Sequence, residues 1–263
     1  DIFLELEKNR DKLDVIKGEF NDPKYMRVHR TISSTRMDIK IANVTIENKI
    51  TNILEPLASI AYSLGFEYHH GLIEHMWKEI MKNHAHDSIS CCCTDQVHKE
   101  IMSRFELAHD KADKLIDFYM RKIVDAMEDK EGMDKLGVFN LLPYERTEVI
   151  ETKIRLRGGS FTLYDKLGKT VDYYIVNKEE LDPGLIDRQI VHYGNYDPFY
   201  EYTIEFTAEN IPAMGYDTYF IKYNTKEYGI QDKKEDKKII ENKYYKIYAN
   251  ENGTINVLDK KLN

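Results

Sequence analysis

The spacing of hydrophobic residues changes once along the chain, near residue 132, and no other feature constrains the fold as strongly. Before this point, apolar residues recur every three or four positions, which is the period of a helix with one buried face. The pattern predicts helices over about 37–65, 72–83 and 95–129. Two long helices flanking a short one favour a three-helix bundle.

Two residues predict where the first of these helices is interrupted and where it ends. Pro56 lies inside the pattern and predicts a kink, because proline removes one backbone hydrogen bond and collides with the preceding turn. Gly65 follows the last apolar position and predicts a C-terminal cap. The stripe expected on the buried face consists of Ile39, Ala42, Ile46, Ile50, Ile53, Leu57, Ile60 and Leu64.

After residue 132 the apolar residues alternate with polar ones, which is the period of a half-buried strand. Many short strands separated by Gly and Asp/Asn turns indicate part of an antiparallel β-sandwich. The expected strands cover 150–156, 171–175, 188–192, 200–206, 218–223 and 244–249, and the charge-dense run 226–238 is expected to be a solvated loop. Composition divides at the same point, since eight of nine Met precede residue 134 and fifteen of nineteen Tyr follow residue 140.

Charge and composition exclude several classes of function. The net charge is -8, which argues against a nucleic-acid surface and against a protein that binds anionic membranes. No apolar run approaches the roughly 18 residues of a membrane span. The chain has no starting Met and no leader pattern, so we expect it to begin inside a longer protein.

All three cysteines are consecutive, at Cys91, Cys92 and Cys93. Adjacent cysteines are poor disulfide partners, and no CxxC spacing is present, so neither a disulfide scaffold nor a thiolate zinc finger is favoured. This usage predicts a reducing compartment, and we expect a cytoplasmic protein. A structural explanation, small residues at a tightly packed turn, is favoured for the run itself.

Five of nine histidines lie between His69 and His86, and the densest polar cluster is 83–90. His84 and His86 are two positions apart, so a regular helix would not direct both to one ligand. We expect one of them to be functional and the other to pack or hydrogen-bond nearby. Imidazole beside the carboxylate of Asp87 suits a divalent metal, although one His and one Asp are too few for a closed site. For the pairs His70/Glu74 and His75/Glu79, helix support is favoured over ligation.

The segment His86-Asp87-Ser88-Ile89, followed by the cysteine turn and Asp95–His98, resembles the metal-binding loop of glycoside hydrolase family 38. These are zinc-dependent, retaining α-mannosidases, and the similarity extends to the bacterial branch that includes mannosylglycerate hydrolases. Further similar segments are Ser33–Arg36, Glu47–Leu57, Phe139–Pro143 and Ile240–Tyr245. The resemblance implies three parts: the end of an α/β barrel-type catalytic domain (1–34), a helical bundle domain with the metal loop (35–133) and the N-terminal part of a β-sandwich (134–263).

The resemblance also implies residue roles. His86 would be a Zn²⁺ ligand, and Asp87 would contact hydroxyls of a bound mannose. The nucleophile and the acid/base are not assigned to any residue of this chain, and whether Asp22 lines the active site is open. One departure concerns the turn, where the family usually has glycine at the Ser90 and Cys91 positions and often serine at Cys93. Its backbone conformation is therefore open, because glycine freely adopts positive φ and cysteine does not.

We therefore expect part of an α+β, multidomain α-mannosidase that cleaves α-mannosides with retention through a covalent mannosyl-enzyme. The chain alone should be inactive. Its partner would be an α-mannoside or a mannosylglycerate-like substrate, without nucleic acid or membrane, and a homo-oligomer is left open. The alternative is a non-catalytic module of helical bundle and β-sandwich that binds carbohydrate or serves assembly.

Overall fold

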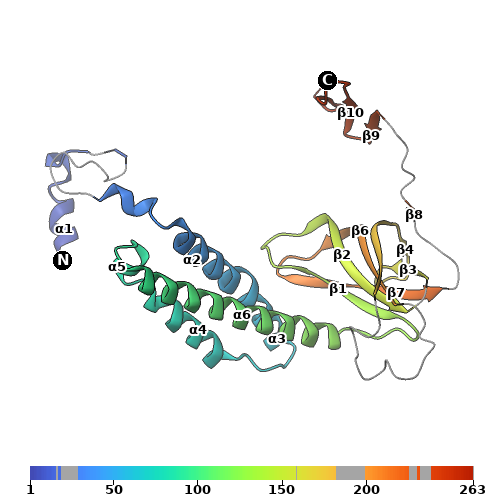
Figure 1. The fold of residues 1–263 in the computed structure, drawn as a ribbon, viewed down its shortest axis with the longest axis horizontal. Helices are drawn as coiled ribbons and strands as arrows, with labels where there is room; N and C mark the ends of the chain where they lie inside the picture. Colours follow the sequence, from blue (N-terminus) through green and yellow to red (C-terminus); the bar gives the residue numbers. More distant parts are fainter. Residues whose placement is uncertain are drawn as a thin grey trace. The chain divides into compact units, whose positions relative to one another are not determined.

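The computed structural model describes residues 1–15, 17–18, 29–157, 159–181, 199–224, 230–231 and 238–262. The chain forms two compact units, residues 1–123 and 124–263, and each is described by itself (Figure 1). Among the described residues, no helix is long and apolar enough to span a membrane. The combination of helices followed by largely antiparallel sheets is the α+β class expected from the change of period.

The N-terminal residues form short helices. These are α1 (Ile2–Glu7), η1 (Arg10–Lys12) and η2 (Arg30–Ser33), and α1 has no buried residue. Within the described residues this segment packs into no α/β domain, so its assignment to the end of a barrel remains a prediction. Asp22, whose place at the active site was left open, lies outside the described residues.

The first long helix is interrupted by a π-helical turn. It consists of α2 (Met37–Lys49), the π-helix η3 (Ile50–Leu54) and α3 (Glu55–Ser63), with Pro56 in the first turn of α3. A widened turn before a proline accommodates the hydrogen bond and the space that the ring takes away. The predicted interruption at Pro56 is thus confirmed as a π-helical turn.

The π-helical turn also shifts the buried stripe by one residue. Ile39, Ile46 and Ile50 are buried as predicted, but Leu54 replaces Ile53, which is 40% exposed. The predicted stripe is confirmed at Leu57 but was wrong at Ile53 and Leu64, which are both 40% exposed, because it continued the 3.6-residue period through the π-helical turn. Beyond the π-helical turn the buried positions are Leu57, Ala58 and Ala61.

Gly65 caps α3 in the predicted way. Its φ is +92°, its amide donates to the Tyr62 carbonyl at 3.0 Å, and the Phe66 amide donates to the Ala61 carbonyl at 3.1 Å. This pair of bonds is a Schellman cap, which favours glycine because of its left-handed backbone. The chain can therefore turn directly into the next helix.

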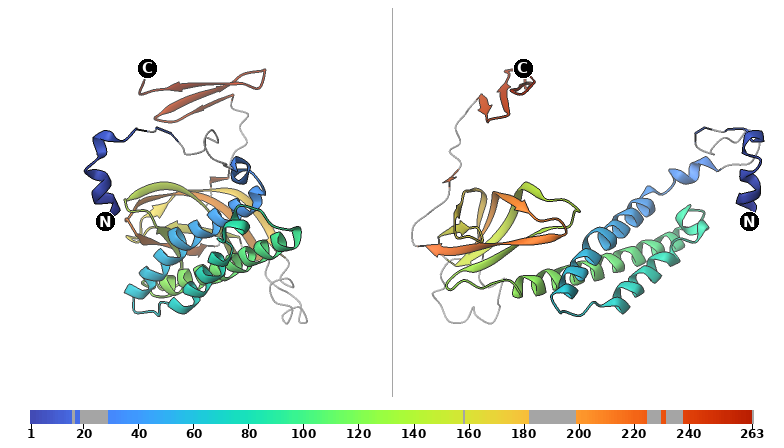
Figure 2. Two further views of the ribbon diagram at one scale, coloured as in Figure 1. Left: turned by 90° about the vertical axis from the view of Figure 1, so that its left-hand side faces the viewer. Right: turned by 180° about the vertical axis from the view of Figure 1, so that it is seen from behind.

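The remaining helices are α4 (His70–Lys82), the short α5 (His86–Ile89) and α6 (Asp95–Asp125). Figures 1 and 2 show α2 with α3, α4 and α6 running side by side, which is the predicted three-helix arrangement. The side chains that α4 and α6 bury are Ile73, Met76, Ile80, Ile101, Phe105, Ala108, Ala112, Tyr119 and Ile123.

The second unit contains two four-stranded sheets, with orders β1-β7-β3-β4 and β2-β6-β5-β8. All pairings are antiparallel except the short β5–β8 pair. The strands are β1 (Asp134–Asn140), β2 (Arg146–Arg157), β3 (Ser160–Tyr164), β4 (Thr170–Val171), β5 (Tyr173–Leu181), β6 (Phe199–Ile211), β7 (Gly215–Asn224) and β8 (Ile230–Gln231). The expected strand at 188–192 lies outside the described residues, as does most of the 226–238 loop, apart from β8 and residue 238.

One hydrophobic core joins the two sheets. Val138 of β1 and Phe161 of β3 belong to the same buried cluster as Ile154 of β2 and Ile204 of β6. Inner faces that share a core define a sandwich, so the predicted architecture is borne out for this part of the chain. Within the core, Phe161 stacks on Tyr173 with ring centroids 4.5 Å apart.

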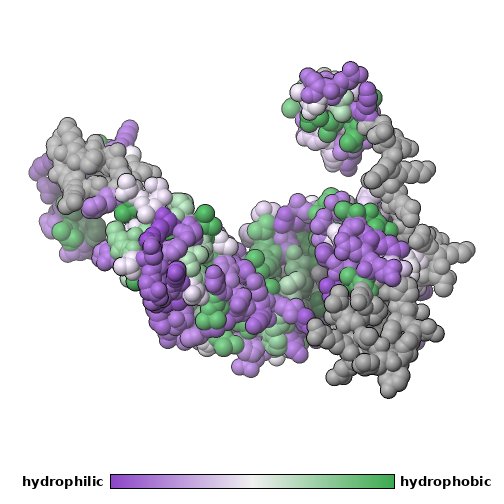
Figure 3. Space-filling view, in the orientation of Figure 1, coloured by the Kyte–Doolittle hydropathy of each residue, from purple (hydrophilic) through white to green (hydrophobic). Residues whose placement is uncertain are grey.

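A third, small sheet has the order β11-β10-β9, with β9 (Ile239–Glu241), β10 (Tyr245–Ala249) and β11 (Ile255–Asp259). Several of its apolar residues are exposed, among them Ile240 at 68% and Val257 at 55%. Figure 3 shows this apolar surface interrupted by polar side chains.

Candidate functional site

The predicted metal loop, residues 84–95, connects α4 to α6, and its start is fixed by a buried amide. The Asn83 side chain is fully buried; it donates to the Ile101 carbonyl at 3.1 Å and accepts from Arg104 Nη1 at 3.0 Å. An amide satisfied on both sides is costly to displace. The loop therefore leaves α4 in a defined direction.

His86 and Asp87 lie in the first turn of α5, and both side chains project into solvent. Their exposed fractions are 93% and 68%, and His86 Nε2 lies 3.1 Å from Asp87 Oδ1. The Ser90 hydroxyl donates to the His86 carbonyl, so the backbone is held even though the imidazole is exposed. An accessible imidazole next to a carboxylate is available to bind a metal or a polar ligand.

His84 lies in a different environment. Its Nε2 is 2.7 Å from Asn43 Oδ1 and 3.5 Å from Glu47 Oε1, both on α2. Two acceptors at this nitrogen fix the tautomer that carries its proton there. Of the two neighbouring histidines, His84 is therefore bound to α2, whereas His86 is exposed and contacts only its neighbour Asp87 among the contacts above.

The backbone of the cysteine turn is left-handed at Cys91. Its φ is +71°, a conformation that glycine adopts without steric cost and that strains other residues. The side chain is only 7% exposed, and its Sγ donates to the Thr35 carbonyl at 3.2 Å. The turn therefore adopts the glycine-type conformation with a cysteine in place. All three cysteines are free thiols.

Two ion pairs join the start of α2 to the start of α6. Arg36 Nη2 lies 2.6 Å from Asp95 Oδ1, and His98 Nε2 lies 2.7 Å from Asp38 Oδ2. Burial alone would raise the pKa of Asp38, but the hydrogen bond from His98, with help from the Ile39 amide, outweighs it and lowers that pKa. The carboxylate form is thereby favoured, which maintains the link between the helices.

Residue types alone did not reveal the part played by α2. Arg36 belongs to a segment quoted for its family resemblance, but nothing in the sequence paired it with Asp95. The sequence likewise did not pair Asn43 with His84. The available signal was the spacing of Arg36, Lys40, Asn43 and Glu47, which places polar side chains on one face of α2.

The described residues contain no group of three or more His, Cys, Asp or Glu side chains that could hold a metal ion. Glu74 and Glu79, which the sequence paired with His70 and His75, form ion pairs with Lys78 at 2.8 Å and with Lys82 at 2.5 Å instead. The hydrogen bond from Lys78 lowers the pKa of Glu74. These residues stabilise α4, and His86 stands as a single candidate ligand.

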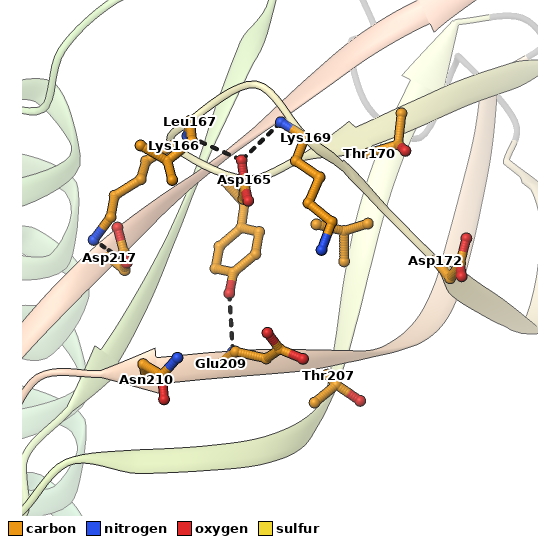
Figure 4. A pocket seen from close by; sticks show the side chains of 12 residues that line it. Asp165, Lys166, Leu167, Lys169, Thr170, Asp172, Thr207, Glu209, Asn210 and Asp217 are labelled. Carbon is orange, nitrogen blue, oxygen red and sulfur yellow. Dashed lines mark hydrogen bonds and ion pairs between the residues drawn. The ribbon is translucent and has the colours of Figure 1, made fainter.

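A pocket of 640 Å³ lies in the second unit, beside the β3–β4 turn (Figure 4). Asp165 accepts from the amides of Leu167 and Lys169 at 2.9 and 2.8 Å, and Lys166 pairs with Asp217 at 2.8 Å. These contacts shape the turn that forms one wall. Because Asp165, Lys166 and Asp217 are engaged in these contacts, we favour the His86 loop over this pocket as the candidate site.

Comparison with known proteins identifies the helical unit. Residues 27–123 match the family model described as the alpha mannosidase middle domain. The helices that carry His86 and Asp87 therefore lie in a region similar to the middle domain of family 38 α-mannosidases.

Individual relatives are consistent with this family. The protein named "Putative mannosylglycerate hydrolase" from Halalkalibacterium halodurans is 26% identical over 255 residues, which cover 87% of this chain and 28% of that protein. Human alpha-mannosidase 2C1 is 26% identical over 151 residues, or 57% of this chain and 14% of that protein.

Two solved structures from Enterococcus faecalis are similar. A protein in glycosyl hydrolase family 38 has a TM-score of 0.65 at 24% identity and matches 99% of this chain and 33% of that chain, which supports the fold alone. An alpha-mannosidase has a TM-score of 0.60 at 25% identity and matches 88% of this chain and 29% of that chain. The chain thus spans about a third or less of the relatives it matches.

Proposed function

We propose that this chain works as part of a family 38 glycosidase that cleaves α-mannosides with retention. The observation that carries the proposal is the alpha mannosidase middle domain match over residues 27–123, which contains the exposed His86–Asp87 pair. The names of the curated relatives support a mannoside or mannosylglycerate-like substrate. We also propose a reducing, cytoplasmic location, because the three cysteines are adjacent in the sequence and are poor disulfide partners.

In this proposal His86 is one ligand of a Zn²⁺ ion. Its side chain fits that role because it is exposed, and Asp87 occupies only one of its two ring nitrogens. Zinc needs at least three protein ligands in such sites, so the remaining ligands come from outside the described residues. When bound, the ion would orient the sugar and stabilise charge in the transition state.

Asp87 would accept hydrogen bonds from sugar hydroxyls. Its carboxylate is 68% exposed and next to His86, so a sugar held at the ion would lie within its reach. Retention requires two carboxyl groups about 5–5.5 Å apart, a nucleophile and an acid/base. We place both outside this chain, and we propose that residues 1–34 border the domain that carries them.

The test uses both the 263-residue chain and the longer protein that we propose contains it. The chain alone should not turn over an aryl α-mannoside, whereas the longer protein should do so and should contain zinc. His86→Ala in the longer protein should abolish turnover and reduce zinc content. His75→Ala is the matched control, because His75 is also exposed but lies on α4 away from the loop.

The outcomes separate this proposal from its alternative. Turnover by the 263-residue chain alone would disprove the placement of the catalytic carboxyl groups. Unchanged zinc content in His86→Ala would disprove the ligand role. A longer protein without zinc or turnover would favour the non-catalytic carbohydrate-binding or structural module.

A further inference from the structure

One polar face of α2 contacts the loop that carries His86. Lys40, Asn43 and Glu47 are spaced three and four positions apart, so they lie along one side of the helix, and Arg36 precedes them at the N-cap. Every one of them reaches residues 84–95: Arg36 contacts Asp95, Lys40 contacts Ile89 and Cys91, and the other two contact His84. Figures 1 and 2 show α5 close to the start of α2.

Lys40 makes the most contacts in this set. Its half-buried ammonium group donates to the Thr35 carbonyl at 2.9 Å, to the Ile89 carbonyl at 3.0 Å and to Cys91 Sγ at 3.0 Å. These acceptors use all three of its N–H groups. Two of these acceptors belong to the loop and one to the residues before α2, so the hydrogen bonds of Lys40 hold the loop against the helical bundle.

The positions of these acceptors explain what Lys40 controls. Ile89 is the last residue of α5 and lies three positions after His86, so its carbonyl fixes the single helical turn that directs the imidazole. Cys91 holds a left-handed backbone that only surrounding contacts can maintain. A charged donor at both places opposes relaxation of the turn.

We propose that Lys40 is a positioning residue that holds the α5 turn, and thus His86 and Asp87, in the orientation required for zinc and sugar binding. The positioning role rests on the proposed function, but the hydrogen bonds from Lys40 to Ile89 and Cys91 are contacts within this chain. The exposed His86 side chain contacts Asp87, its neighbour in the same turn, at 3.1 Å, so the placement of this pair follows the backbone of α5.

The first test measures, in the 263-residue chain, how strongly Lys40 protects the loop from opening. Hydrogen exchange of the amides at residues 88–91 should become at least about tenfold faster in Lys40→Met, because charged hydrogen bonds to the turn are lost. Lys49→Met is the matched control, since Lys49 lies on the same helix and pairs with Asp113 on α6 at 2.6 Å. It should leave exchange in the loop unchanged.

A conservative variant keeps the test decisive if Lys40→Met fails to fold. Lys40→Arg retains a charged donor and should retain most of the protection at residues 88–91, while Lys40→Gln, which has no charge, should lose more of it. Equal exchange in wild type, Lys40→Met and Lys40→Gln would overturn the proposal. So would an equal loss of protection in Lys40→Met and Lys49→Met, because it would indicate a general effect on α2.

The second test asks, in the longer, zinc-loaded protein, whether the hydrogen bonds of Lys40 to the loop affect zinc binding. Lys40→Met should release zinc to a chelator about tenfold faster, as is typical when an outer contact that orients a ligand is removed. Lys49→Met should release it at the wild-type rate. Unchanged zinc content in His86→Ala would refute the proposed function while leaving the exchange result intact. Wild-type zinc release in Lys40→Met, despite faster exchange, would refute the positioning role.

Discussion

Two segments that resemble the same family use their polar residues in opposite ways. In the helical unit, the His86 and Asp87 side chains are 93% and 68% exposed, and their loop is held by donors from another helix. In the β-sandwich unit, Asn140 is 3% exposed and donates to the carbonyls of Tyr144, Ile211 and Pro212 at 2.8–3.1 Å. Its own oxygen accepts from the Leu142 amide at 3.1 Å.

The difference separates structural from functional motif residues. Asn140 pairs with backbone groups of the turn after β1 and of the connection from β6 to β7, so its side chain serves the fold. At the His86 loop, backbone groups are satisfied by Lys40 and Ser90, so the imidazole remains free. Each of the following substitutions tests this distinction, from the largest expected effect to the smallest.

Asn140→Ala should cause the largest loss. Removing the amide leaves buried carbonyls without donors, and we expect the free energy of unfolding of the β-sandwich unit to fall by about 2–3 kcal/mol. Thermal and urea unfolding followed by circular dichroism would measure it. Asn177→Ala, at an exposed position on β5, is the control and should change stability by less than about 0.5 kcal/mol. Similar losses in both variants would contradict the structural role.

Glu201→Gln should have a smaller effect that depends on pH. Hydrogen bonds from Lys153 at 2.6 Å and Arg155 at 2.8 Å lower the pKa of Glu201 below its ordinary value of 4.5. A lowered pKa stabilises the fold above pH 4.5, and that contribution disappears as the pH falls through the folded-state pKa.

The variant should therefore be less stable than wild type at pH 7, and the two should converge in acid. Unfolding midpoints measured from pH 7 to pH 2 would reveal this. Glu151→Gln is the control, because Glu151 lies opposite Glu205 on the same strand pair and is exposed. A constant difference between wild type and Glu201→Gln at every pH would rule out the ion pairs as its source.

Substitutions at Cys91 isolate the strain in the turn. Cys91→Ala keeps a Cβ at a φ of +71°, whereas Cys91→Gly removes it. Both lose the thiol contacts, so the glycine variant should be the more stable by about 1 kcal/mol. This order reverses the usual preference for alanine over glycine. An alanine variant at least as stable as the glycine variant would show that the turn has relaxed.

The sequence predicted elements wherever one period ran without interruption. The change of period near residue 132 yielded the helical and β-sandwich parts, and the alternation at 150–156 correctly indicated β2. The stripe before Gly65 was wrong at Ile53, whose place Leu54 takes, because a π-helical turn inserts one residue into the helical period. Nothing in the residue types marks such a turn except Pro56.

The candidate site was predictable only in part. The spacing of His84 and His86 implied that they differ in role, and the structure places His84 in a hydrogen bond with Asn43. Lys40 could not be found in this way, because its three partners are two carbonyls and a thiol, and pairing of a side chain with a distant carbonyl leaves no pattern in the sequence.

His86→Ala should have the smallest effect on stability. The imidazole is 93% exposed and contacts an exposed carboxylate, so its removal should change the free energy of unfolding by less than about 0.5 kcal/mol. His84→Ala, which removes the 2.7 Å hydrogen bond to Asn43, should cost about 1 kcal/mol in the same urea titration. A loss on His86→Ala as large as that on His84→Ala would place His86 with Asn140 as a structural residue. A near-zero loss combined with reduced zinc content in the longer protein would mean that the fold presents this side chain without depending on it.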